Sequence, residues 1–273
     1  MSSGLTRVAS NIQAMQSLFH LNKTNEGIAK HQLNLATGKR INSPGDDPAG
    51  YQLSRGLEAR RNGLEAALEN VNNAQSILNI ADGGYQNIMD ILQTMKSKAT
   101  QAADGSLGST QRTAINDQFT ALRSEVDQIV TETTFNDNAL IDGTFSVTFQ
   151  TGEGASETLA VALSSATSTG LGINSLSMST QASASAAITS LDTAINTLAT
   201  RAQDVGEYKA RLSAKENTLS VSITNTEAIR STYEDADFAK EQMEVLKMQI
   251  LQQTAVASLS QANQSPQIVL SLF

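Results

Sequence analysis

The sequence predicts a mainly α-helical protein in which long antiparallel coiled-coil helices flank one small β-hairpin. Two long stretches carry apolar residues in a 3-4 repeat, and a short stretch between them alternates apolar and polar residues. Only 4% of the 273 residues are aromatic and 17% are charged. A core poor in aromatic residues must be built from Leu, Ile, Val, Ala and Met, which suits helix–helix seams better than a compact globule.

The two ends of the chain resemble each other, because residues 8–22 and 248–273 contain no Asp, Glu, Lys or Arg. Both have helical periodicity, which near the N-terminus runs through Leu5, Val8, Ile12, Met15 and Phe19. A soluble helix normally keeps charge on its outer face. We therefore expect the two terminal helices to pair with each other and to be buried in an assembly.

The longest repeat begins after Gly56 and predicts a coiled-coil seam. Its positions are Leu57, Arg60, Leu64, Ala67, Val71, Ala74, Leu78, Ala81, Tyr85, Ile88, Leu92, Met95 and Ala99. Arg60 is the one member that is neither apolar nor aromatic. We expect Gly83-Gly84 to interrupt this helix at some cost in stability. Asp104-Gly105 and Gly108 should end it, before another helix with apolar residues from Ile115 to Ile129.

The pattern changes to that of a β-hairpin near 145–163. Residues 145–149 alternate apolar and polar, residues 159–163 form a second short strand candidate, and 151–156 make the turn. Residues 164–180 are predicted to form an irregular polar connection. Helical periodicity returns at Ile188 and continues to about Ala262, with room for a break near 232–237. Lys209 and Glu216 are the polar exceptions in this seam, and Pro266 should end the helix.

The segment 36–50 has the features of a joint between helices. Gly38 can end the first helix in a left-handed conformation. Ser43-Pro44 and Asp47-Pro48 are turn and helix-start signals. Lys39 and Arg40 lie close in sequence to two carboxylates, Asp46 and Asp47, so we expect local ion pairs.

Composition excludes several classes of function. A net charge of −8 leaves no basic stripe for nucleic acid. The sequence contains no run of 18 apolar residues, so no transmembrane helix is predicted. The N-terminus has none of the features of a cleaved signal peptide. We therefore expect no membrane partner; the plain interpretation is a cytosolic protein, although export without a cleaved signal stays open.

The sequence predicts no catalytic, cofactor or metal site. His20 and His31 are about three helical turns apart, too far to share one metal ion. The carboxylates Glu234, Asp235 and Asp237 have no nucleophile or metal partner in view, and we interpret them as solvated or helix-start charge. No phosphate-binding loop motif occurs. The chain is therefore not expected to be an enzyme.

The joint segment resembles that of bacterial flagellins, and further motifs of this family occur in the same order along almost the whole chain. They are Phe135-Asn136 with residues 140–143, and then residues 171–176, 228–239, 249–253 and 262–266. The resemblance implies a structural subunit that is exported unfolded by the flagellar type III system with an export chaperone. It would polymerise outside the cell into the flagellar filament, which also contains hook-associated and cap proteins.

The resemblance also implies a domain organisation. Residues 1–40 and 233–273 would be the two arms of D0, a terminal helix pair that forms the inner tube. Residues 41–232 would be D1, a helical bundle with the β-hairpin, and no outer domain is expected. The inner-tube contacts are predicted to be Leu5, Val8, Ile12, Met15, Phe19, Leu246, Ile250 and Leu259. The predicted D0–D1 joint residues are Gly38, Asn42, Pro44, Asp46, Asp47 and Pro48, and the predicted D1 core residues are Leu64, Val71, Leu78, Leu92, Leu198 and Leu219.

Two other functions are open from the sequence. A hook–filament junction protein shares the architecture, and Asp46-Asp47-Pro48 is similar to the segment in such proteins. An enzyme or small-ligand binder would need a convergent set of titratable groups, which is not visible.

Thr94, Lys98 and Gln118 depart from the pattern that Toll-like receptor 5 recognises in the family, so recognition by that receptor is predicted to be weak.

Overall fold

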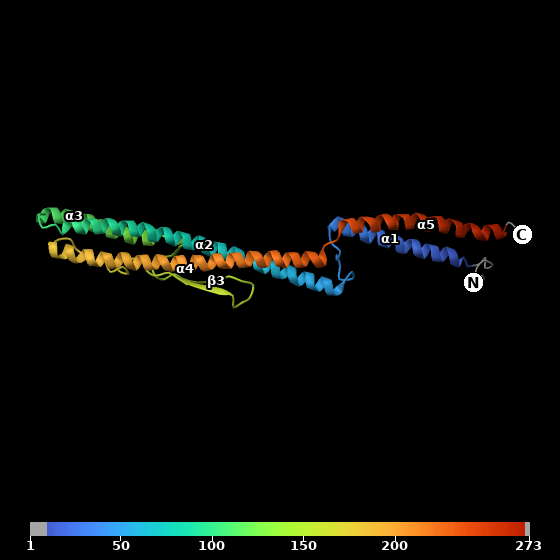
Figure 1. The fold of residues 1–273 in the computed structure, drawn as a ribbon, viewed down its shortest axis with the longest axis horizontal. Helices are drawn as coiled ribbons and strands as arrows, with labels where there is room; N and C mark the ends of the chain where they lie inside the picture. Colours follow the sequence, from blue (N-terminus) through green and yellow to red (C-terminus); the bar gives the residue numbers. More distant parts are fainter. Residues whose placement is uncertain (1–9, 271–273) are drawn as a thin grey trace. The chain divides into compact units, whose positions relative to one another are not determined.

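The computed structural model describes residues 10–270, with side chains as far as Gln264. Within this range the chain forms five helices and two pairs of short antiparallel strands, which confirms the mainly α-helical fold class (Figure 1). The helices are α1 (Ile12–Thr37), α2 (Pro48–Ala102), α3 (Ser109–Glu132), α4 (Gln181–Glu234) and α5 (Phe238–Leu270). The strands are β1 (Thr134–Phe135), β2 (Asn138–Ala139), β3 (Ser146–Gln150) and β4 (Thr158–Ala162).

The chain packs into two compact units. One contains residues 1–59 and 225–273, and the other contains residues 60–224. The first turns of α2 and the last turns of α4 therefore belong with the terminal helices. This division describes packing. The second unit begins at residue 60, some 20 residues after the expected start of D1 at residue 41.

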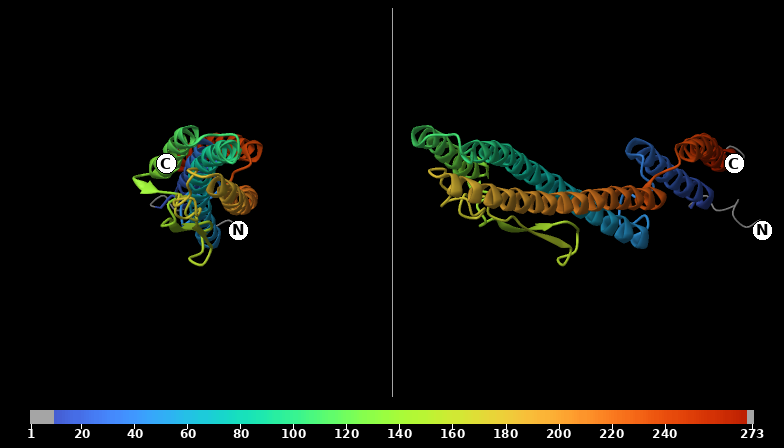
Figure 2. Two further views of the ribbon diagram at one scale, coloured as in Figure 1. Left: turned by 90° about the vertical axis from the view of Figure 1, so that its left-hand side faces the viewer. Right: turned by 60° about the vertical axis from the view of Figure 1, so that its left-hand side comes forward.

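In the first unit, α1 and α5 lie side by side and antiparallel, as Figure 1 and the right view of Figure 2 show. Asn11 caps the start of α1, where its Oδ1 accepts a hydrogen bond from the Ala14 amide at 3.0 Å. Gly38 ends the helix at φ 70°, in the left-handed conformation that the sequence indicates. The break left open near 232–237 is present, between the end of α4 and the start of α5.

Pro266 does not end α5, so this prediction was wrong. The helix continues through it to Leu270. A proline has no N–H to donate to the carbonyl four residues earlier, which here is that of Ala262. That carbonyl instead accepts a hydrogen bond from Asn11 Nδ2 at 2.7 Å, so part of the cost of a proline inside a helix is offset.

The second unit has a continuous apolar core between α2, α3 and α4. On α2 the predicted seam from Val71 to Ala99 is buried, with Leu78, Leu92 and Met95 fully inaccessible to solvent. On α4 the seam is buried at Leu191, Leu198, Val205 and Leu212. The 3-4 repeat therefore identifies the residues that pack together.

The three polar exceptions in the seams all have partners. Lys209 Nζ lies 3.2 Å from Asp82 Oδ2, and Gln75 Nε2 donates to Glu216 Oε2 at 2.9 Å. Both pairs link α2 to α4, and they are one heptad apart on each helix. Polar groups at seam positions specify register in coiled coils, and these two pairs specify the same antiparallel register. Arg60 instead pairs with Glu153, in the turn between β3 and β4, at 2.9 Å.

Helix α2 runs unbroken through Gly83-Gly84, so the expected interruption was also wrong. The second glycine has a packing role. A Cβ on Gly84 would lie 2.8 Å from Thr133 Oγ1 and 3.0 Å from Ile141 Cδ1, whereas one on Gly83 would meet nothing within 4 Å. Glycine suits position 84 because the side chains of Thr133 and Ile141 pack directly against the helix backbone there.

The β3–β4 hairpin has the pairing Phe149↔Leu159, and it buries Leu159 and Val161 of β4. Val147 of β3 remains 41% exposed, so β3 is less buried than its alternation suggests. A second hairpin, β1–β2, was not predicted; its turn has positive φ at Asn136 and Asp137.

The connection 164–180 is irregular, as predicted, but side chains from the helices fix it. Asp127 accepts hydrogen bonds from the Ser168 amide and hydroxyl, both at 2.7 Å. The Tyr85 hydroxyl donates to the Ser164 carbonyl at 2.8 Å, and burial raises the pKa of Tyr85 to about 12. Arg201 donates to the carbonyls of Ser165 and Gly170.

We predict opposite effects of alanine at the two adjacent glycines. Gly83→Ala should stabilise the protein by about 0.5–1 kcal/mol, because alanine favours the helix and has free space there. Gly84→Ala should destabilise it by about 1–3 kcal/mol, because Thr133 and Ile141 must move. Thermal unfolding followed by circular dichroism measures both, and shifts of the same sign would contradict the packing role of Gly84.

Candidate functional site

The face that α1 turns toward α5 is largely small or polar. Its half-buried residues include Asn11, Ala14, Ser17, Thr24 and Gly27. Several larger apolar side chains of the same helix lie on the outside, whereas Leu21, Ile28 and Leu35 are half-buried. The exposed fractions of the outward side chains are 46% for Ile12, 68% for Met15, 48% for Leu18 and 66% for Phe19.

Helix α5 presents a similar contrast between its two faces. Val245 and Ala262 are buried, and Met248, Ala255 and Leu259 are half-buried. Several outward side chains are again large and apolar, with exposed fractions of 63% at Met243, 54% at Leu246, 64% at Ile250 and 51% at Val256. We use the name outer face for eight of the exposed large apolar side chains of the two helices. It consists of Ile12, Met15, Leu18, Phe19, Met243, Leu246, Ile250 and Val256.

The predicted inner-tube contacts divide into three groups. Five of them belong to the outer face: Ile12, Met15, Phe19, Leu246 and Ile250. Leu259 instead lies in the half-buried face of α5. Leu5 and Val8 lie outside the described residues.

Hydrogen bonds between side chains, and from side chain to backbone, link the paired helices. His31 Nδ1 lies 2.5 Å from Glu241 Oε2, and Gln252 Nε2 donates to Asn25 Oδ1 at 2.7 Å. Asn11 adds the bond to the Ala262 carbonyl. His31 therefore has a carboxylate partner, and His20 lies elsewhere, on a polar groove.

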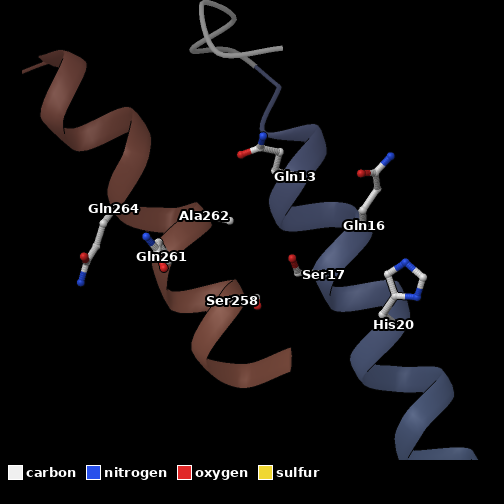
Figure 3. Close-up of a pocket in the computed structure, with 8 residues that line it drawn as sticks. All are labelled: Gln13, Gln16, Ser17, His20, Ser258, Gln261, Ala262 and Gln264. Atoms are coloured by element: carbon white, nitrogen blue, oxygen red, sulfur yellow. The ribbon is translucent and has the colours of Figure 1, made fainter. Parts of the chain in front are cut away.

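This groove runs between α1 and α5 near their free ends (Figure 3). Its volume is about 670 Å³. It is lined by Gln13, Gln16, Ser17 and His20 of α1 and by Ser258, Gln261, Ala262 and Gln264 of α5. Amides and hydroxyls dominate the lining, which contains no carboxylate or cationic amine. Such a lining offers hydrogen-bond donors and acceptors.

The joint residues between α1 and α2 form a compact polar turn. Asn42 Nδ2 donates to Asn34 Oδ1 and to the Lys39 carbonyl, both at 2.9 Å, and Asn34 is buried. The Ser43 amide and hydroxyl both donate to Asp46 Oδ2 at 3.0 Å. Asp46 is thereby held against the chain just before α2 begins.

Asp47 and Pro48 start α2 in the predicted way. Asp47 Oδ1 accepts from the Gly50 amide at 3.0 Å, and Pro48 is the first helical residue. Gly50 also allows close packing, because a Cβ there would lie 2.6 Å from Ile41 Cδ1. Pro44 is exposed in the turn.

The ion pairs of the joint differ from the local ones expected. Lys30, in α1, pairs with Asp46 at 2.8 Å and lowers the pKa of that carboxyl to about 2. Lys39 pairs with Glu234, and Arg40 donates to the Tyr233 carbonyl at 2.8 Å. The basic residues therefore connect segments that are distant in sequence, so the expectation of pairs within 39–47 was wrong.

Glu234 is the centre of this joint, and its interpretation as a solvated charge was also wrong. Its side chain is buried, and Lys39 Nζ lies 2.5 Å from Oε1. Oε2 accepts hydrogen bonds from Ser54 Oγ at 2.5 Å and from Arg230 Nη1 at 2.6 Å. Burial by itself raises the pKa of Glu234, but these three donors outweigh it and lower the pKa to about 2.

Backbone hydrogen bonds complete the joint. The Arg40 amide donates to the Glu234 carbonyl at 2.7 Å, and the Ala236 amide donates to the Gly38 carbonyl at 2.9 Å. The segment that follows α1 and the segment that precedes α5 are therefore joined by both backbone hydrogen bonds and ion pairs. In the sequence, the one available signal was the placement of Glu227 and Glu234 three and four residues from Arg230.

The six predicted D1 core residues are all buried. Val71, Leu78, Leu92 and Leu198 are inaccessible, and Leu64 and Leu219 are 5% exposed. Among the described residues, no three His, Cys, Asp or Glu side chains come together in a way that could hold a metal ion. Within the same range, no helix combines the length and apolar character needed to cross a membrane.

Glu234→Gln should weaken the joint by roughly 2–4 kcal/mol, because Lys39 and Arg230 lose a buried counter-charge. Hydrogen exchange of the Arg40 and Ala236 amides, measured by mass spectrometry at one pH, should become faster. Asp235→Asn removes the neighbouring exposed carboxylate and is the matched control. Equal exchange in the two variants would contradict the role of Glu234.

The joint should also weaken in acid. The pKa of Glu234 is lower in the folded protein, about 2, than its ordinary value of 4.5. Its contribution to stability is therefore complete above about pH 4.5 and is lost as the pH falls toward 2. Amide exchange corrected for its intrinsic pH dependence should reveal this loss in the wild type, and Glu234→Gln should remove much of it. An unchanged acid dependence in that variant would assign the effect to other groups.

Comparison with known proteins identifies the family. The bacterial flagellin N-terminal helical region matches residues 8–146, and the bacterial flagellin C-terminal helical region matches residues 188–273. Flagellins from Listeria monocytogenes and Bacillus subtilis are each 32% identical to the chain, and each alignment covers 97% of this chain and 99% of the relative. In fold, the chain is similar to a putative flagellar hook-associated protein from Vibrio parahaemolyticus, with a TM-score of 0.59, 14% identity and coverage of 70% of this chain and 100% of that one. The two matched helical regions and the nearly full-length alignments show that the chain belongs to the bacterial flagellin family, which is a family of structural filament proteins and not of enzymes.

Proposed function

We propose that the chain polymerises into the flagellar filament through the outer face of α1 and α5. The observation that carries this proposal is the exposure of large apolar side chains on two helices that already pair with each other: Met15, Phe19, Met243 and Ile250 are each more than 60% exposed. Removing such side chains from water is favourable by about 25 cal/mol per Å². Neighbouring copies can supply the cover that the single chain lacks.

Among the described residues, the proposed inner-tube contacts are therefore the five predicted residues on the outer face; for Leu5 and Val8 the proposal rests on the family resemblance alone. Leu18, Met243 and Val256 are added because their exposure is similar. Leu259 supports the helix pair from within. Contacts of this kind are heterologous, and a heterologous contact that does not close produces an open helical polymer.

We further propose the domain organisation expected from the family. Residues 1–40 and 233–273 form the D0 arms, and residues 41–232 form D1 with the six buried core residues. The joint residues, with Glu234 at their centre, hold the D0 arms to the ends of the D1 helices. The support is the network of hydrogen bonds and ion pairs around Glu234.

Family membership also supports proposals about partners and location. The subunit is proposed to leave the cell through the flagellar type III system with the help of an export chaperone, without a cleaved signal peptide. In the extracellular filament it would meet copies of itself, hook-associated proteins and the cap protein. Its chemistry supports no role with nucleic acid or membranes, since its net charge is −8.

The hook–filament junction function is the second candidate and is less well supported. Its main structural support is the fold likeness to the hook-associated protein, which at 14% identity concerns the fold alone. The relatives that align over nearly the whole chain are named as flagellins. Negative-stain electron microscopy with and without filament seeds separates the candidates, because only a filament subunit should give long, uniform polymers.

Met15→Glu should abolish filaments or reduce their number at least tenfold, because a charge would be buried between copies. The isolated subunit should keep its helix content, since Met15 is 68% exposed in the single chain. Met15→Leu keeps an apolar side chain and is the control that should still polymerise. Normal filaments of Met15→Glu, counted by electron microscopy, would refute burial of this part of the outer face.

Recognition by Toll-like receptor 5 is predicted to be weak. Thr94 and Gln118 are exposed and Lys98 is half-buried. Arginine, which the family usually has where this chain has Thr94, is a typical interface anchor. A reporter-cell assay should give a much smaller response than a known agonist flagellin, and Thr94→Arg should raise the response. An equal response of the wild type would contradict the prediction.

A further inference from the structure

Asn11 uses both ends of its side-chain amide. As the N-cap of α1, its Oδ1 accepts from the Ala14 amide at 3.0 Å. Its Nδ2 donates to the Ala262 carbonyl of α5 at 2.7 Å. A helix cap requires only the acceptor. The donor therefore serves a second purpose, which the cap does not explain.

The carbonyl that Asn11 contacts is unusual within α5. In an α-helix each carbonyl accepts from the amide four residues later. For Ala262 that residue is Pro266, which has no N–H, and α5 contains no other proline. Ala262 is 9% exposed, so without Asn11 its carbonyl would be a poorly solvated acceptor without its helical partner.

We propose that Asn11 is a positioning residue that fixes the axial register of α1 against α5 through the carbonyl that Pro266 frees. Because a proline frees a carbonyl at one position inside α5, a slip of one helical turn would place Asn11 opposite a carbonyl that is already bonded. This inference rests on the proposed function. The register determines the axial positions of the outer-face residues of α1 relative to those of α5, on the surface offered to neighbouring copies.

The strongest competing explanation is that Asn11 only caps α1. Aspartate separates the two ideas, because it is also a good N-cap and its charge favours a helix N-terminus. The cap explanation therefore predicts that Asn11→Asp is neutral or stabilising. The register explanation predicts a loss, because a carboxylate oxygen would replace the donor 2.7 Å from the Ala262 carbonyl.

Asn25→Asp is the matched control on the same helix. Asn25 also bonds across to α5, but there its Oδ1 is the acceptor, for Gln252 Nε2 at 2.7 Å. An aspartate at position 25 keeps that acceptor and adds the same charge. A general effect of negative charge on α1 would therefore affect both variants, whereas loss of a donor affects only Asn11→Asp.

The experiment measures the soluble subunit concentration that remains in equilibrium with filaments, after sedimentation. Asn11→Asp should raise it by about tenfold, and Asn25→Asp by less than about twofold. Asn11→Ser keeps a cap but is too short to reach α5, and it should also raise the concentration. In a Pro266→Ala background, the effect of Asn11→Ser should fall below about twofold, because the alanine N–H satisfies the Ala262 carbonyl.

An unchanged concentration for Asn11→Asp, or an effect of Asn11→Ser that Pro266→Ala does not reduce, would overturn the proposal. A wild-type chain that forms no filaments would instead count against the proposed function. In that case hydrogen exchange in the isolated subunit still tests the register. Exchange across residues 255–264 should be faster in Asn11→Asp than in Asn25→Asp, and equal exchange would overturn the proposal.

Discussion

The constraint on which the structure depends is that large apolar side chains must be removed from water, and the two units of the chain meet it differently. In the unit of residues 60–224, α2 and α4 pack their 3-4 repeats against each other and bury them within one chain. In the other unit, the face that α1 and α5 share combines small and polar residues with a few apolar ones, such as Val245, Met248 and Leu259. The apolar side chains that this helix pair leaves exposed, such as Met15 and Ile250, can be covered by neighbouring copies, which would couple its stability to its assembly.

Polar groups supply the specificity that apolar packing lacks. Leu, Ile and Ala seams tolerate sliding, because one apolar layer resembles the next. The pairs Lys209–Asp82 and Gln75–Glu216 remove this ambiguity in the α2–α4 seam. Three hydrogen bonds connect the terminal helix pair in a comparable way: His31–Glu241, Gln252–Asn25 and the Asn11 bond to the Ala262 carbonyl.

The joint shows how electrostatics can connect segments that are nearly 200 residues apart in sequence. Glu234 is buried yet ionised, because Lys39, Ser54 and Arg230 together replace its hydration. Burying a charge is costly unless it is paired and hydrogen-bonded. The network is therefore sensitive to loss of any one member, which makes the connection specific as well as strong. Such a joint suits a protein whose terminal helices must be held in a defined way during polymerisation.

The sequence by itself determined the helical class, the seam residues, the β3–β4 hairpin and the family. These follow from local periodicity and from motifs such as 36–50, because a repeat of apolar residues identifies a buried face wherever the helix packs. Pairwise contacts between distant residues were decided only by the tertiary structure. In that structure Glu234 is buried and not at the surface, Gly84 packs against another segment, and α5 continues through Pro266. In each case the deciding group is on another segment: Lys39 and Ser54 for Glu234, Thr133 for Gly84, and Asn11 for the carbonyl that Pro266 leaves free. The residues next to each position in the sequence do not identify these partners. The burial of Glu234, the packing of Gly84 and the continuation of α5 therefore depended on which distant segments the fold brings together.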